Sequence, residues 1–119
     1  MYHITLINKR KKVCIFDIED REHIVKGFAT QYLMGTKFQF DRNELQKKNI
    51  ANLRIIETEF TIGKIVKNKN NERLKEKLKK NIVPIMLTKE IVIFDDNIGN
   101  NITDVILKEA EEFRKELGL

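Results

Sequence analysis

The chain has 119 residues, of which 41% are hydrophobic and 34% are charged, and its formal net charge is +5. This length and composition predict one domain over residues 1–119 and exclude a disordered chain. The single cysteine, Cys14, excludes an intrachain disulfide framework, and we expect it to pack as a small hydrophobe. No apolar run approaches the roughly 20 residues that cross a bilayer. The N-terminal residues lack a signal-peptide pattern, so we expect a cytoplasmic protein without membrane contact.

The first elements of the chain have the pattern of a β-hairpin. Residues 2–8 alternate between apolar and polar side chains, and residues 13–18 are again apolar and β-branched. The basic run Lys-Arg-Lys-Lys at 9–12 joins the two segments and contains no glycine. The pattern predicts two antiparallel strands, but it does not define the type of turn between them.

An amphipathic helix of about 14 residues should follow the hairpin. Asp20 stands where an N-cap residue is expected. Ile24, Phe28 and Tyr32 then recur at a spacing of four, which places them on one helical face. Gly35 is the expected end of the helix, because glycine readily adopts the left-handed conformation of a C-terminal cap.

The middle of the chain predicts two strands and a polar helix. Residues 37–40 read as a short strand, residues 41–52 have polar turn character, and residues 53–60 read as a longer strand. Residues 72–80 predict a short outer helix that Asn71 caps.

Two short apolar runs precede the last helix. Residues 82–87 contain Pro84, which limits them to a sheet edge or an irregular segment. Residues 91–94 predict a short buried strand. The final helix should begin with Thr103 as its N-cap and end at Gly118.

This order of elements, β-β-α-β-β-α-(β)-β-α, predicts an α+β fold. We expect a small mixed or mostly antiparallel sheet of about five to six strands, with two to three helices packed on it.

The sequence contains no recognisable catalytic motif. It has no serine, so a Ser-His-Asp triad is excluded, and its five glycines are too scattered to form a phosphate-binding loop. His3 and His23 have no partner at metal-ligand spacing, and we expect them to be half-buried or on the surface. Asp95 and Asp96, with Asp104 beyond them, could hold a divalent cation, but turn formation is the preferred explanation of these residues. We therefore expect no enzyme activity, no cofactor and no metal site.

The charge of the chain is unevenly distributed. Residues 64–80 carry eight Lys or Arg against two Glu, whereas residues 81–119 carry four against eight acidic residues. The basic segment can contact a nucleic acid, with help from Lys9–Lys12, or it can face a protein partner or solvent. It lacks stacking aromatics and has one arginine, which disfavours base readout. The candidate contact residues are Lys64, Lys67, Lys69, Arg73, Lys77 and Lys80.

A longer pattern runs through much of the chain. It consists of Ile24-Val25, YLMGTKFQFD at 32–41, Asn49-Ile50, LRIIETE at 53–59, FDD at 94–96 and GNNIT at 99–103. The pattern resembles a small α+β module at the N-terminus of bacterial antiviral-defence proteins, in which a TIR or predicted nucleotide-binding domain often follows. Asn101-Ile102 departs from the Asp-Val that is usual there. The resemblance implies an accessory module that senses, docks or oligomerises, with a covalently attached effector domain or a separate protein as its partner.

Three functional hypotheses follow from the sequence. The first is a non-catalytic interaction or regulatory module of a bacterial or phage defence-related protein. The second is a nucleic-acid-binding module, or a small phage-encoded inhibitor, that uses residues 64–80. The third is a metal-dependent enzyme at Asp95 and Asp96. A homodimer through paired strand edges is compatible with the first hypothesis.

Overall fold

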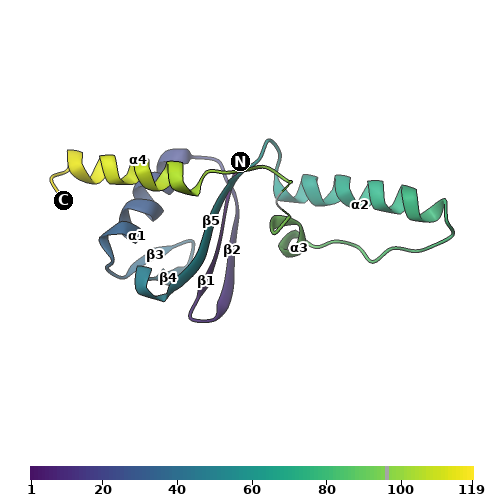
Figure 1. Cartoon of the computed structure of the whole chain (residues 1–119), viewed down its shortest axis with the longest axis horizontal. Coiled ribbons are helices and arrows are strands. Elements are labelled where there is room, and N and C mark those ends of the chain that lie inside the picture. Colours follow the sequence, from purple (N-terminus) through teal and green to yellow (C-terminus); the bar gives the residue numbers. More distant parts are fainter. Residues whose placement is uncertain (96) are drawn as a thin grey trace.

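The computed structural model describes residues 1–95 and 97–119 and has the predicted α+β fold (Figure 1). In chain order, its elements are β1 (Tyr2–Asn8), β2 (Lys11–Ile18), the π-helical η1 (His23–Ala29), α1 (Thr30–Met34), β3 (Phe38–Phe40), β4 (Asn43–Leu45), the 3-10 turn η2 (Lys47–Asn49), β5 (Ile50–Glu57), α2 (Ile62–Leu78), α3 (Lys89–Ile93), β6 (Asn100–Asn101) and α4 (Thr103–Glu116).

The central sheet is antiparallel and has the strand order β2-β1-β5-β6, while β3 and β4 form a separate two-stranded ladder. The predicted hairpin of β1 and β2 is confirmed. Its turn residues Lys9 and Arg10 have φ angles of 49° and 72°, as a two-residue turn between twisted strands requires. Asn8 faces Lys11 on β2 and Ile50 on β5, so the start of β5 lies beside this turn.

The predicted helix after the hairpin is confirmed, but its first turns are wound as a π-helix. The N–H and the hydroxyl of Thr30 both donate to the carbonyl of Val25, five residues earlier. Gly35 ends the helix with a φ of 78°, in the left-handed region that glycine tolerates best.

Helices cover both faces of the central sheet. On one face, Ile4 and Ile55 pack with Phe28 of η1 and Ile106 of α4 in the main core. On the other face, a smaller cluster joins Ile62, Val92 and Ile93 to the half-buried side chains of Cys14 and Phe16. The register explains the division, because Ile4 pairs with Ile15 and Thr5 with Cys14 on opposite faces.

Helix α2 begins ten residues earlier than the sequence predicted. Its N-cap is Thr61, whose hydroxyl accepts from the N–H of Lys64, and Asn71 lies inside the helix instead of capping it. The start was missed because Ile62, Ile65 and Val66 have helical spacing but residues 67–71 add no apolar side chain, so the periodic signal covers too short a window.

The predicted strand at 91–94 is wrong, because residues 91–93 belong to α3 and Phe94 is its C-cap, while Thr88 caps the start by accepting from the N–H of Ile91. A short apolar run fits a buried helical turn as well as a strand. The polar region 41–52 also contains more structure than expected, namely β4, η2 and the start of β5.

The predicted cap of the last helix is also wrong. The hydroxyl of Thr103 accepts from the N–H of Ile55 at 2.8 Å, which ties α4 to the sheet. The side-chain oxygen of Asn101 instead accepts from the N–H of Thr103 at 3.1 Å. Gly118 ends the helix region with a φ of 73°, as expected.

Gly99 is required by the close approach of β5 and β6. A Cβ atom at this position would lie 2.2 Å from the carbonyl oxygen of Glu57. We expect Gly99→Ala to lower the free energy of unfolding by about 2–3 kcal/mol, because main-chain atoms must move apart. Gly63→Ala is the matched control, since its Cβ would meet only Lys89 Cε at 3.9 Å. Urea denaturation should show Gly63→Ala at least as stable as the parent, and equal loss in both variants would contradict the explanation.

Candidate interaction surface

The molecule measures 62 × 28 × 20 Å because one part of the chain projects from the sheet. This part, residues 62–93, consists of α2, the chain that returns beside it, and α3, and it is called the arm (Figure 1). Its base packs against the sheet through Ile62, Val92 and Ile93. The remainder of α2 extends away from the sheet (Figure 1).

Helix α2 has too little apolar surface to be held by ordinary core packing. Its buried residues are Ile62 at the base and Asn70 near the middle. A helix that is polar all round gains little from burial and is marginal by itself. The stability of the outer part of α2 therefore depends on the returning chain.

Side chains of α2 bond to the main chain of the returning segment. The Asn70 amide donates to the carbonyl of Leu87 at 3.0 Å and accepts from its N–H at 2.7 Å. Arg73 Nη2 donates to the carbonyl of Ile85 at 3.3 Å. Because Asn70 is only 8% exposed, its two bonds satisfy an amide that would otherwise be buried without partners.

The same segment presents large aliphatic side chains to solvent. Pro84 is buried and Leu87 is half-buried, whereas Val83 and Ile85 are 82% and 86% exposed. Together with the neighbouring exposed residues they form the apolar tip, which consists of Leu78, Ile82, Val83, Ile85 and Met86. No charged residue occurs between Lys80 and Lys89. Gathered apolar side chains of this kind mark sites of interaction with another molecule.

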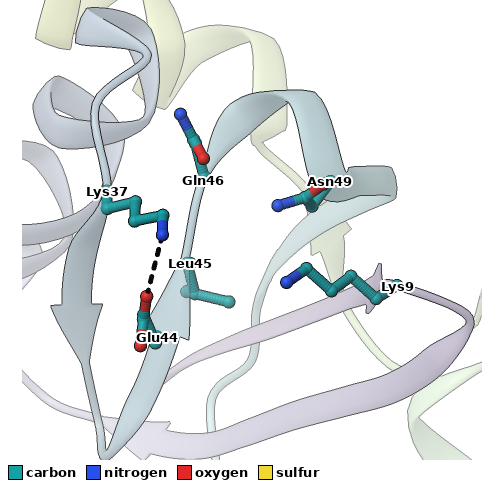
Figure 2. A pocket seen from close by; sticks show the side chains of 6 residues that line it. All are labelled: Lys9, Lys37, Glu44, Leu45, Gln46 and Asn49. Atoms are coloured by element: carbon teal, nitrogen blue, oxygen red, sulfur yellow. Dashed lines mark ion pairs between the residues drawn. The ribbon is translucent and has the colours of Figure 1, made fainter.

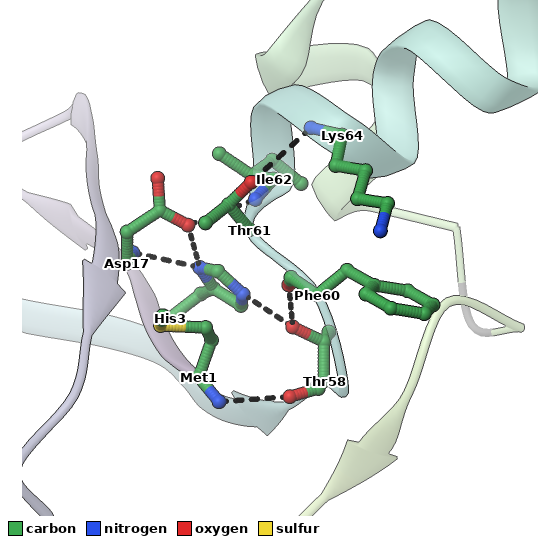
Figure 3. Close-up of polar contacts among 8 residues, drawn as sticks. All are labelled: Met1, His3, Asp17, Thr58, Phe60, Thr61, Ile62 and Lys64. Atoms are coloured by element: carbon green, nitrogen blue, oxygen red, sulfur yellow. Dashed lines mark hydrogen bonds and ion pairs between the residues drawn. The ribbon is translucent and has the colours of Figure 1, made fainter.

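A buried histidine joins the arm to the sheet (Figure 3). His3 Nδ1 accepts from the N–H of Asp17 at 3.0 Å, and His3 Nε2 lies 2.7 Å from Thr58 Oγ1. The Thr58 hydroxyl donates to the carbonyl of Phe60, so Nε2 must carry the ring proton. The Asp17 carboxylate accepts from the N–H of Ile62 at 2.8 Å, which ties the first turn of α2 to β2.

The expectation that His3 is half-buried or on the surface is wrong, because its side chain is fully buried beneath the arm. Burial lowers the pKa of His3 from its ordinary value of 6.5, the Asp17 carboxylate opposes this shift, and the N-terminal ammonium adds to it. The ring is therefore held in its neutral form.

The predicted basic residues lie on the arm, but several of them bond within the molecule. Lys69 forms a 2.9 Å ion pair with Asp95, and Lys64 Nζ lies 4.1 Å from the centre of the Phe60 ring. Arg73 bonds to the returning chain, as described above. Lys67 and Lys80 are exposed and Lys77 is half-buried. The sequence thus located this segment, but it did not predict that Lys69 and Arg73 support the arm.

The carboxylates proposed for a metal-dependent enzyme have other contacts or lie apart. Lys69 lowers the pKa of Asp95, and the N–H of Asn97 donates to the same carboxylate at 2.9 Å. Asp104 is exposed on α4, and Asp96 lies outside the described residues. Among the residues that the structure describes, no three His, Cys, Asp or Glu side chains gather in a metal-binding arrangement.

Cys14 lines a pocket of about 150 Å³ with Lys12, Glu90, Ile91 and Phe94. Burial raises the pKa of the Cys14 thiol, the Glu90 carboxylate raises it further, and Lys12 opposes both. Such a thiol stays protonated near neutral pH and is a poor nucleophile. Its contact with the smaller core cluster agrees with the expected packing role.

Comparisons of the chain with protein-family models, with curated proteins and with solved structures give no match. In the part of the chain that the structure describes, no helix combines the length and the apolar character needed to cross a membrane. The apolar tip is the feature that the sequence reasoning missed as a site. The sequence feature that could have indicated the apolar tip is the uncharged run 82–87 directly after the basic segment. The sequence predicts only a sheet edge or an irregular segment for this run.

We expect Asn70→Ala to release the returning segment from α2. The change leaves the N–H and carbonyl of Leu87 without their partners, which should cost about 1–3 kcal/mol locally. Hydrogen exchange at the Leu87 amide should become at least tenfold faster. Asn71→Ala, at an exposed position one residue further along α2, is the control and should leave this exchange rate unchanged. Equal rates in the parent and Asn70→Ala would show that the amide does not hold the segment.

The buried His3 should make stability depend on pH. Between its lowered folded pKa and 6.5, the unfolded state binds more protons than the folded state, so stability falls as the pH drops below 6.5. The stabilisation that neutral His3 provides is complete above pH 6.5. Below it, the free energy of unfolding falls by at most about 1.4 kcal/mol per pH unit. Urea titrations across this range should show the slope in the parent and in His23→Gln. A His3→Gln variant that kept the full slope would assign the effect to other groups.

Proposed function

We propose that this chain is a non-catalytic cytoplasmic module that docks a protein partner through the apolar tip of its arm. The observation that carries the proposal is the exposure of Val83 and Ile85, at 82% and 86%, on a segment that Asn70 and Arg73 hold in place. Exposed aliphatic side chains leave hydrophobic free energy, about 25 cal/mol per Å² of apolar area, to be gained on contact with a partner.

The main chain of the apolar tip supports the same function. Within the described residues, the N–H groups of Val83, Ile85 and Met86 have no hydrogen-bond partner. An extended segment with free main-chain groups and outward aliphatic side chains suits addition to the sheet edge of another protein. The ordered arm also lowers the entropy that binding would cost.

The charges around the tip indicate which partner would fit. Lys79 and Lys80 lie between Leu78 and Ile82 of the tip, Lys89 follows the tip, and all three are exposed. A partner with an apolar groove and an acidic rim would complement this arrangement. The resemblance to modules of bacterial antiviral-defence proteins supports a sensing or docking role, with an effector domain in the same protein or a separate protein as the partner.

The second candidate function is binding of nucleic acid, or inhibition of such binding by a phage-encoded protein, through residues 64–80. The excess of eight basic residues over two Glu favours it. The positions of these residues favour it less, because they surround α2 instead of following one face, and Lys69 and Arg73 bond internally. We rank the metal-dependent enzyme last, since Asp95 is already paired with Lys69.

The docking function is tested by affinity capture from a lysate of the source organism. The tagged chain should retain a stoichiometric protein after nuclease treatment and at raised salt. Val83→Glu/Ile85→Glu should lose that protein, because two desolvated carboxylates would oppose contact. The control is Val105→Glu/Leu117→Glu, which adds the same charges at half-exposed apolar positions of α4. Retention by the tip variant, or saturable turnover of a substrate by the chain alone, would exclude the proposed function.

A further inference from the structure

The central sheet separates charge between its two ends. The pairing of Asn8 with Lys11 and with Ile50 brings the turn at Lys9 and Arg10 beside η2. Tyr2 pairs with Ile18 and with Glu57 at the other end of the sheet. The acidic residues Asp17, Glu19, Asp20, Glu57 and Glu59 occur in or next to those strand ends. The antiparallel register therefore collects cations from segments about forty residues apart on one end of the sheet.

A main-chain hydrogen bond joins two of the cationic segments. The N–H of Lys9 donates to the carbonyl of Asn49 at 3.1 Å, directly after Lys47 and Lys48. Lys9 and Lys37 line one pocket of about 130 Å³ from opposite sides, with Leu45 between them (Figure 2). The basic end is defined as Lys9, Arg10, Lys11, Lys37, Lys47 and Lys48, all of which are exposed.

Little negative charge offsets the basic end. Glu44 lies among these residues and pairs with Lys37 at 3.8 Å, with both side chains more than 60% exposed. Lys47 Nζ lies 5.6 Å from the centre of the Tyr32 ring, which leaves its charge close to the surface. Six cations beside one carboxylate create a concentrated positive potential.

The turn of the hairpin presents its cations at a conformational cost. Lys9 and Arg10 both have positive φ angles, which Asn and Gly adopt far more readily. Here the angles belong to the two-residue turn itself, which leaves both cationic side chains exposed at this end of the sheet.

We propose that the basic end binds the phosphate backbone of nucleic acid without sequence preference. Exposed lysines act as point charges that phosphates attract, and among residues 1–50 Met34 is the one exposed large hydrophobic residue. An interface with a protein would call for an apolar centre, and insertion into a membrane would call for apolar side chains beside the cations. The basic end has neither, so a flexible or helical polyanion fits it best.

This surface differs from the one that the sequence indicated. Lys9–Lys12 were expected to assist residues 64–80, but the turn at Lys9 and Arg10 lies away from the arm (Figure 1), while Lys12 lines a pocket with Glu90 and Ile91 of α3. The turn joins Lys37, Lys47 and Lys48 instead. The inference goes beyond the proposed docking function, because a chain with both surfaces could bring a protein partner to a nucleic acid.

The test measures binding of the full chain to fluorescein-labelled single-stranded and duplex DNA of about 20 nucleotides, at salt concentrations from about 50 to 200 mM. The parent should bind at the low salt with a Kd in the micromolar range that non-specific binding gives. Lys9→Glu/Lys48→Glu should weaken binding at least tenfold and reduce the salt slope by about two, one for each lysine. Lys75→Glu/Lys79→Glu on the arm is the control with the same charge change, and it should weaken binding less than threefold.

Circular dichroism and thermal unfolding establish that both variants fold. If the glutamates disturb the turn, Lys9→Gln/Lys48→Gln replaces the glutamate variant in the binding measurement. Equal loss in the two variants would overturn the proposal by assigning binding to net charge alone. Absence of DNA binding by the parent at the low salt would overturn it as well. So would tighter binding to vesicles of mixed anionic and neutral lipid than to either DNA. Binding of the protein partner is measured separately, with the Val83→Glu/Ile85→Glu variant. A negative result for DNA binding therefore leaves the docking proposal standing, and the reverse also holds.

Discussion

The bond between the Asp17 carboxylate and the N–H of Ile62 is the contact on which the rest of the structure depends. It fixes the first turn of α2 to β2, and the N–H of Asp17 in turn donates to buried His3 on β1. Thr58 completes the group from the end of β5. Because neutral His3 donates through one ring nitrogen and accepts through the other, it can serve two strands at once. The direction of the arm is therefore set by a few polar bonds, supported by the small cluster around Ile62.

The arm shows how a polar helix can be ordered without a large core of its own. Asn70 and Arg73 bond to the returning main chain in the manner of a neighbouring strand. This arrangement turns Pro84 inward and leaves Val83 and Ile85 in solvent. A segment held in this way exposes apolar surface without collapsing onto the sheet, because collapse would break buried hydrogen bonds. The stability of the arm and its availability for docking therefore have the same origin.

The two candidate surfaces differ in the physical driving force they offer. The apolar tip offers hydrophobic burial, which is insensitive to salt screening, whereas the basic end offers counterion release, which weakens steeply as salt is added. Internal bonds also use part of the positive charge of the arm, through Lys69 and Arg73. The lysines of the basic end are exposed, and Glu44 offsets only part of their charge.

Local patterns in the sequence determined the first hairpin, the helix that Gly35 ends, the last helix and the position of the basic segment, because periodicity and glycine act over a few neighbouring residues. They did not determine the start of α2, since its apolar stripe ends after Val66, or the helical state of residues 91–93. The tertiary structure alone decided that His3 is buried, that Val83 and Ile85 are exposed, and that Lys9 bonds to Asn49. Burial and long-range contact depend on which surfaces pack together, and strand register places residues about forty positions apart side by side.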